Sequence, residues 1–196
     1  MENLPEKADD IFEILTSNKP GFICENSVDR EIQKLCNVID ESFDSLYDYF
    51  ARIGFLLKRG NGYYYFSKDF KRTTLEDRLE RALRFIDLVD FFKSYETTFT
   101  AYSTFTVAAI VQRCQMDIAL KQKLQDINQS LKLNKENLTD IAEAVVAQLD
   151  RQFIELEDQD ERRYKVLSSF RYLEDLFARI IEEDADEESE GDLLYQ

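Results

Sequence analysis

Apolar residues in the first third of the chain recur in steps of three and four, which is the spacing of one face of an α-helix. Further along, two runs of aromatic and aliphatic residues flank Gly60-Asn61-Gly62, and this arrangement is typical of a β-hairpin. Asn26-Ser27 offers an N-terminal cap to the second predicted helix. The pattern predicts, in order, a helix over 10–15, a strand over 22–24, helices over 28–39 and 41–53, and a hairpin over 55–66.

The next stretch begins with a capping box, in which Thr73 precedes Glu76 by three residues at the start of an apolar stripe that reaches Tyr95. Residues 96–106 are rich in Thr, Phe and Tyr and fit a loop, a strand or both. Beyond them the helical periodicity resumes, and a polar turn between two apolar runs predicts a second hairpin. The predicted elements are a helix over 73–95, helices over 107–113, 118–127 and 138–149, and a hairpin over 153–167.

The order helix, helix, hairpin therefore occurs twice along the chain. It predicts a mostly α fold with small β wings, in the α+β class, built from two tandem winged-helix units. Between residues 182 and 192 there are eight acids and no base, a composition that predicts a disordered acidic tail. The predicted boundaries are 8–72 for the first unit, 73–170 for the second, 171–182 for a C-terminal helix and 183–196 for the tail.

Composition limits the chemistry that is available. There is no histidine, so imidazole-based catalysis and imidazole metal ligands are excluded, and the five glycines form no phosphate-binding motif. The three cysteines are far apart and form no CxxC pair, which favours a reducing cytoplasm over a disulfide or zinc framework. We find neither a secretory signal nor an apolar run of the roughly 20 residues that a membrane span needs. We therefore expect a cytoplasmic protein that is not an enzyme and has no catalytic residues, cofactor or metal.

Charge argues against sequence-specific DNA recognition. The chain carries a net charge of −15, which repels polyphosphates at long range. In a winged helix, the helix before the hairpin normally enters the major groove with basic and amide side chains. Both candidate helices are acidic instead. Their acids are Glu41, Asp44 and Asp48 in the first unit and Asp140, Glu143 and Asp150 in the second, against Arg52 and Arg151 respectively.

One region has the opposite sign. Residues 58–84 hold eight bases and four acids, a net charge of +4 that leaves −19 for the remainder. The bases at the first hairpin are the candidate DNA-binding residues, and they are Lys58, Arg59, Lys68, Lys71 and Arg72. The three arginines of the following helix fit better a solvated face, where they pair with neighbouring acids.

Other conspicuous residues are better explained by packing. The run Tyr63-Tyr64-Tyr65 is able to stack on bases, but aromatic residues in a wing are more often part of a core or an interface. Phe91-Phe92 is expected in the core, and Cys24, Cys36 and Cys114 are expected as small buried apolar residues.

Two winged helices that do not read DNA with their recognition helices suggest a role in holding other proteins. Three parts of the chain carry a family resemblance, and they are Ile11–Leu15 with Gly21–Ile23, Leu46–Arg59 with Gly62–Phe66, and an echo from Leu149 to Leu167. On these residues the chain resembles the MukE/MksE-type kite subunits of bacterial condensin-like SMC complexes, including those of anti-plasmid systems.

The resemblance implies a non-enzymatic homodimer, formed through the first unit, that binds a kleisin chain and thereby an SMC ATPase. It implies a nucleoid-associated location, weak and non-specific DNA contact at most, and a role in chromosome organisation and segregation or in plasmid defence. The alternative is a winged-helix DNA-binding transcription regulator, and a carboxylate-metal nuclease is a third hypothesis that no residue spacing supports. The acidic tail either solubilises the protein or masks a basic groove.

Overall fold

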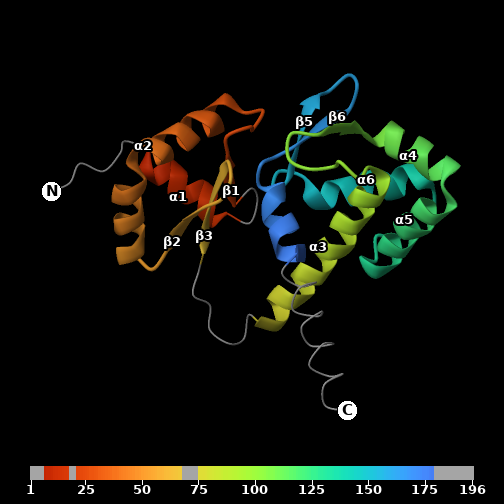
Figure 1. The fold of residues 1–196 in the computed structure, drawn as a ribbon, viewed down its shortest axis with the longest axis horizontal. Helices are drawn as coiled ribbons and strands as arrows, with labels where there is room; N and C mark the ends of the chain where they lie inside the picture. Colours follow the sequence, from red (N-terminus) through yellow and green to blue (C-terminus); the bar gives the residue numbers. More distant parts are fainter. Residues whose placement is uncertain (1–6, 18–20, 68–74, 179–196) are drawn as a thin grey trace, which may run out of the picture.

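The computed structural model describes residues 7–17, 21–67 and 75–178, with side chains from residue 85 onward in the last range. These residues form seven helices, counting the helix over 170–178, and two small antiparallel sheets of three strands each. Figure 1 shows them as two halves that lie side by side. We call residues 7–67 the N-terminal half and residues 75–178 the C-terminal half.

The N-terminal half contains the predicted helix, strand and hairpin in the predicted order, with one helix in place of the two expected over 28–53. The strand order of its sheet is β1-β3-β2, so the third strand of this half lies between the first two. The elements are α1 (Ala8–Thr16), β1 (Phe22–Cys24), α2 (Arg30–Arg52), β2 (Leu56–Arg59) and β3 (Tyr63–Ser67).

Helix α2 differs from its prediction in two ways. It is one helical span with a kink at Ser42, whose φ of −126° and ψ of 25° are not helical, where two separate helices were expected. No glycine or proline ends the first arm, and both arms keep an apolar face on the same core through the buried Ile39 and Leu46. The predicted Asn26-Ser27 cap was wrong, because Asp29 is the cap and its side chain accepts a hydrogen bond from the Glu31 amide.

The turn of the first hairpin requires a glycine at position 62. Gly62 has a φ of +83°, a backbone conformation that residues with a side chain rarely adopt, and a Cβ atom there would also displace the end of the Glu25 side chain. Substitution of this glycine would therefore strain the backbone.

The C-terminal half repeats the strand order of the first sheet, as β4-β6-β5. The open question over residues 96–106 is answered by turns followed by a short strand, and the helix predicted over 138–149 has those bounds. The named elements are α3 (Leu75–Tyr95), β4 (Thr104–Thr106), α4 (Val107–Met116), α5 (Ile118–Ser130), α6 (Leu138–Leu149), β5 (Ile154–Asp158) and β6 (Arg163–Val166).

Aromatic rings fill the core of the C-terminal half. Phe92 is fully buried, and its ring lies 4.7 Å from that of Phe99 and 5.5 Å from that of Phe105. The prediction that Phe91-Phe92 belongs to the core is confirmed, as is the burial of all three cysteines. Burial raises the pKa of each of these thiols above its ordinary value.

Several predictions fall on parts of the chain outside the described residues. They concern the capping box at Thr73, the end of the predicted helix over 171–182, and the acidic tail over 183–196. In the parts that are described, no helix has both the length and the apolar character needed to cross a membrane.

Candidate functional site

The structure places two of the five candidate DNA-binding residues, Lys58 and Arg59, at the end of β2. Lys58 lies opposite Tyr65 in the sheet register and is exposed, and it has no ion pair within the described ranges. Neighbouring side chains on a strand point to opposite faces of the sheet. The side chains of Lys58 and Arg59 therefore point to opposite faces of the first sheet. The other three candidates, Lys68, Lys71 and Arg72, lie outside the described residues.

Arg59 is turned onto helix α2. Its Nη2 atom lies 3.5 Å from Oδ1 of Asp40, and its guanidinium carbon lies 4.5 Å from the centre of the Phe43 ring and 5.5 Å from that of Tyr64. The Tyr64 hydroxyl donates to the same Asp40 carboxylate. Burial, together with this hydrogen bond, raises the pKa of Tyr64 well above its ordinary value. Arg59 thus has local contacts with one acid and two aromatic rings, although its side chain stays 49% exposed.

The surroundings of Arg59 are acidic. A depression of about 390 Å³ beside the α2 kink is lined by Arg59 together with Asp40, Glu41 and Asp44. Two of these acids, Glu41 and Asp44, were the reason for expecting no DNA recognition by this helix. Their carboxylates lie on the same side of the hairpin as the guanidinium, so this surface repels a DNA backbone.

The second hairpin pairs its two arginines with acids. Arg162 pairs with Glu143 of α6 at 2.7 Å. Arg163 pairs with three acids of its own hairpin, at 3.0 Å from Glu157, 2.5 Å from Glu161 and 3.6 Å from Asp158. A depression of about 410 Å³ lies between this hairpin, α4 and α6. It is a concave surface of mixed polarity.

The feature that sequence reasoning missed is the junction between the two halves. Asn26, only 6% exposed, donates from Nδ2 to the carbonyl of Val166 at 3.0 Å and accepts at Oδ1 from the amide of Ser168 at 2.8 Å. The Glu155 carboxylate of β5 accepts from the Ser27 hydroxyl at 2.9 Å and from the Val28 amide at 2.6 Å. The segment just before α2 is therefore bonded to the second sheet.

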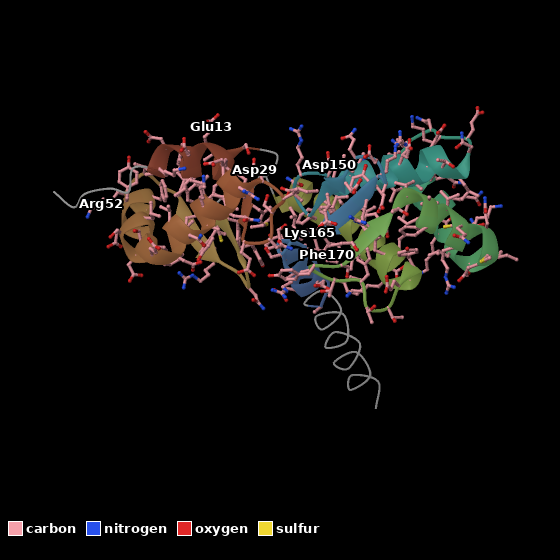
Figure 2. All side chains as sticks on the ribbon, turned by 90° about the horizontal axis from the view of Figure 1, so that it is seen from above. Glu13, Asp29, Arg52, Asp150, Lys165 and Phe170 are labelled. Carbon is pink, nitrogen blue, oxygen red and sulfur yellow. The ribbon has the colours of Figure 1, made fainter. Side chains whose placement is uncertain are left out.

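Aromatic packing and the first hairpin turn complete this junction. The Phe22 ring lies 5.4 Å from that of Phe153 and 5.6 Å from that of Tyr172. Arg171 donates to the carbonyl of Asn61 at 2.9 Å. Figure 2 shows the two halves in direct contact, with Asp29, the cap of α2, on the side of its half that faces the other half. These contacts fix the orientation of the two sheets.

Seven large apolar side chains are exposed among the described residues, and four of them lie in two pairs that are close in sequence. Tyr49 and Ile53, near the end of α2, are 37% and 49% exposed. Met116 and Ile118, where α4 meets α5, are 76% and 86% exposed. Monomeric proteins rarely keep large apolar patches in water, so such positions are candidates for contact with other chains.

No group of three or more His, Cys, Asp or Glu within the described ranges is arranged to hold a metal ion. Neither half brings acids together around a histidine or a reactive thiol, since the chain has no histidine and its three cysteines are free and buried.

The chain was compared with models of known families. The family model described as condensin complex protein MksE matches residues 6–177, which include both sheets and the junction between them. The chain therefore belongs to the MksE family and is a subunit of a condensin-like complex, in a family not known for enzymes. The predicted resemblance is confirmed. A search of curated proteins returns no match.

Proposed function

We propose that this protein is a non-enzymatic, kleisin-binding subunit of a condensin-like SMC complex, composed of two winged-helix units and a C-terminal helix. The observation that carries the proposal is the MksE match across residues 6–177. The repeated strand order of the two sheets supports the winged-helix assignment, because each sheet places its last strand between the other two. Chromosome organisation and segregation, or plasmid defence, is the role we propose, in the cytoplasm and associated with the nucleoid.

The proposed homodimer forms through the N-terminal half. Tyr49 and Ile53 support this, since Tyr49 in the last turn of α2 and Ile53, the residue that caps the helix, are both exposed. An apolar face of this kind loses its unfavourable contact with water when a second copy covers it.

The kleisin chain is proposed to lie along grooves that both halves line. The fixed junction supports this arrangement, because one extended segment is able to contact both sheets at a constant separation. The depression between α4, α6 and the second hairpin is one place for such a segment, with Val107 and Val111 among its apolar lining.

The alternative, a sequence-specific DNA-binding regulator, is not favoured. Arg59 is engaged by Asp40, and the second hairpin pairs its own arginines with acids. Lys58, together with Lys68, Lys71 and Arg72, supports at most weak DNA contact without sequence preference.

The test is co-purification of the protein with candidate kleisin and SMC subunits, together with light scattering on the protein alone. We expect a mass near twice 23.1 kDa and a retained kleisin. Ile53→Asp should give a monomer, while Leu156→Asp should remain a dimer because it alters an apolar residue of similar exposure, 37% against 49%, in the other half. A strict monomer that retains no partner would overturn the proposal, and tight binding to one duplex sequence would support the regulator.

A further inference from the structure

The corner where α4 meets α5 carries the most exposed large apolar side chains in the described part of the chain. Met116 is 76% exposed and Ile118 is 86% exposed. The residue between them, Asp117, is already engaged, since its side chain caps α5 by accepting from the Leu120 amide at 3.1 Å. The side chains of Met116 and Ile118, in contrast, are left mostly in contact with water.

Two cations flank this apolar corner. Arg113 lies three positions before Met116 on α4, and Lys121 lies three positions after Ile118 on α5. At that spacing each cation shares a helix face with its apolar neighbour. Neither has an ion-pair partner among the described residues, whereas the nearby Lys123 pairs with Asp90 at 2.5 Å.

The corner also belongs to a basic region of an acidic protein. Residues 107–135 contain five bases and two acids, a net charge of +3, so the remainder of the chain carries −18. This region attracts a negatively charged segment, and its exposed apolar corner favours a segment that also brings apolar side chains.

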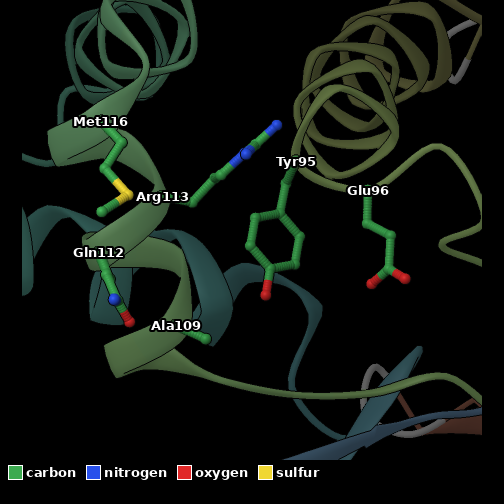
Figure 3. A pocket seen from close by; sticks show the side chains of 6 residues that line it. All are labelled: Tyr95, Glu96, Ala109, Gln112, Arg113 and Met116. Carbon is green, nitrogen blue, oxygen red and sulfur yellow. The ribbon is translucent and has the colours of Figure 1, made fainter.

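A pocket next to the corner is able to receive one such side chain. Figure 3 shows it between the end of α3, which provides Tyr95 and Glu96, and α4, with Arg113 and Met116 on its opposite side. Its volume is about 300 Å³. Glu96 is the one acid in the lining, and its carboxylate accepts from the Thr98 hydroxyl at 3.0 Å.

A segment of the chain itself has the complementary composition. Residues 182–192 contain eight acids and no base, and Leu193-Leu194-Tyr195 follows them directly. This segment lies beyond residue 177, where the family match ends. The acidic residues of this segment match the two cations of the corner. The three large apolar residues that follow match its exposed apolar side chains and the adjoining pocket.

The segment is also attached within reach of the corner. In the helix over 170–178, Glu174 accepts hydrogen bonds from Lys93 at 2.5 Å and from Thr100 at 2.9 Å. These two residues flank the Tyr95 wall of the pocket in sequence. The 17 residues from 179 to 195 span up to about 55 Å when extended, which is enough to turn back along α3.

We infer that residues 182–195 dock, within the same chain, onto the corner formed by Arg113, Met116, Ile118 and Lys121. The apolar side chains of 193–195 cover Met116 and Ile118 and enter the pocket, and the carboxylates lie beside the two cations. A partner that binds this corner has to displace the segment, so the segment acts as a competitive cover for an interaction surface.

Tryptophan fluorescence tests this inference in the full-length protein. The chain contains no tryptophan, so Tyr195→Trp provides a single indole at the end of the proposed segment. We expect its emission to lie at a shorter wavelength than that of free indole in water. It should move to longer wavelength at about 1 M salt, where charge attraction is screened beyond roughly 3 Å.

Variants of the corner make the test specific. In the Tyr195→Trp background, Met116→Ser should lower the ratio of docked to free segment by about tenfold, because a buried methionine contact is lost. Arg113→Glu should also shift the emission to longer wavelength. Leu156→Ser and Lys58→Glu are the matched controls, since they change an exposed apolar residue and an exposed cation elsewhere, and they should leave the emission unchanged.

Three results would overturn the inference. The first is a parent emission equal to that of free indole. The second is a short-wavelength emission that the corner variants do not change, because the segment would then dock elsewhere. The third is recovery of the short-wavelength emission when Tyr195→Trp/Met116→Ser is mixed with the unaltered protein, because the corner of another copy would then be the acceptor. None of these results depends on kleisin binding or on dimer formation through α2.

Discussion

The buried amide of Asn26 allows a quantitative test of the junction between the halves. Asn26→Ala removes a hydrogen bond to the carbonyl of Val166, which still accepts from the amide of Tyr102 at 2.9 Å. It also removes the one acceptor that the described residues provide for the Ser168 amide. A buried donor left without a partner costs about 1–3 kcal/mol, and one lost hydrogen bond costs about 0.5–1.5 kcal/mol. We therefore expect the free energy of unfolding to fall by about 3 kcal/mol.

Urea unfolding of Asn26→Ala and of Asn128→Ala measures this cost. Asn128, in the last turn of α5, makes the same pair of backbone hydrogen bonds: its side chain donates to the carbonyl of Lys135 at 3.0 Å and accepts from the Lys135 amide at 3.1 Å. These two bonds are exposed to solvent. Water replaces those bonds, so Asn128→Ala should cost less than about 1 kcal/mol. The Ser168 amide should exchange its hydrogen faster in Asn26→Ala than in the unaltered protein, and Asn128→Ala should not change its rate of exchange. Equal losses of stability in the two variants would refute the view that Asn26 fixes the junction.

Three further changes test other parts of the structure. Glu155→Ala removes the acceptor of the Ser27 hydroxyl and the Val28 amide, and urea unfolding should show a loss of about 1–2 kcal/mol; unchanged stability would contradict this. Burial raises the pKa of the Cys36 thiol from 9.0 to about 12, so the unfolded chain loses this proton at lower pH than the folded protein. The free energy of unfolding should therefore fall as the pH rises from about 9 toward about 12. An equally steep fall in Cys36→Ala would contradict the assignment to Cys36. Phe92→Ala should cost about 3–5 kcal/mol in the same urea assay, and a loss under about 1 kcal/mol would show that the ring cluster repacks.

Local pattern was sufficient to predict both hairpins and the approximate positions of most helices. Apolar steps of three and four gave the bounds of α6, and Gly60-Asn61-Gly62 gave the position of the first hairpin. A boundary between two helices was predicted near residue 41, where the structure has a kink at Ser42 within one helix. The reason is that Ser42 leaves the helical region without ending the helix, and an apolar pattern contains no information on such a bend.

Contacts between distant residues could not be predicted in the same way. Ser27 and Glu155 are 128 positions apart, and nothing near either residue indicates the other. The pair Asn26-Ser27 fits a helix cap by composition, but in the structure both side chains bond to the C-terminal half and Asp29 takes the cap position. A short polar side chain satisfies either role, so only the packed structure decides between them.

The candidate cations illustrate the same limit. A basic residue at a hairpin tip has the right position to touch DNA, and this position can be inferred from sequence. Whether its charge is free depends on neighbours in space, here Asp40 and the Phe43 ring beside Arg59. Both belong to a different element, α2, and the hairpin sequence contains no sign of them.

The junction has a consequence for how strongly a partner is held. Two modules on a loose linker must lose orientational freedom each time a ligand bridges them, and that loss weakens binding. Here the hydrogen bonds of Asn26 and Glu155 hold the two sheets at one angle before any ligand arrives. On the proposed function, a kleisin segment that has bound one half would meet the other half at a high effective concentration. The distance between the two binding surfaces would then be fixed, and the length of the bridging segment would become a criterion for recognition.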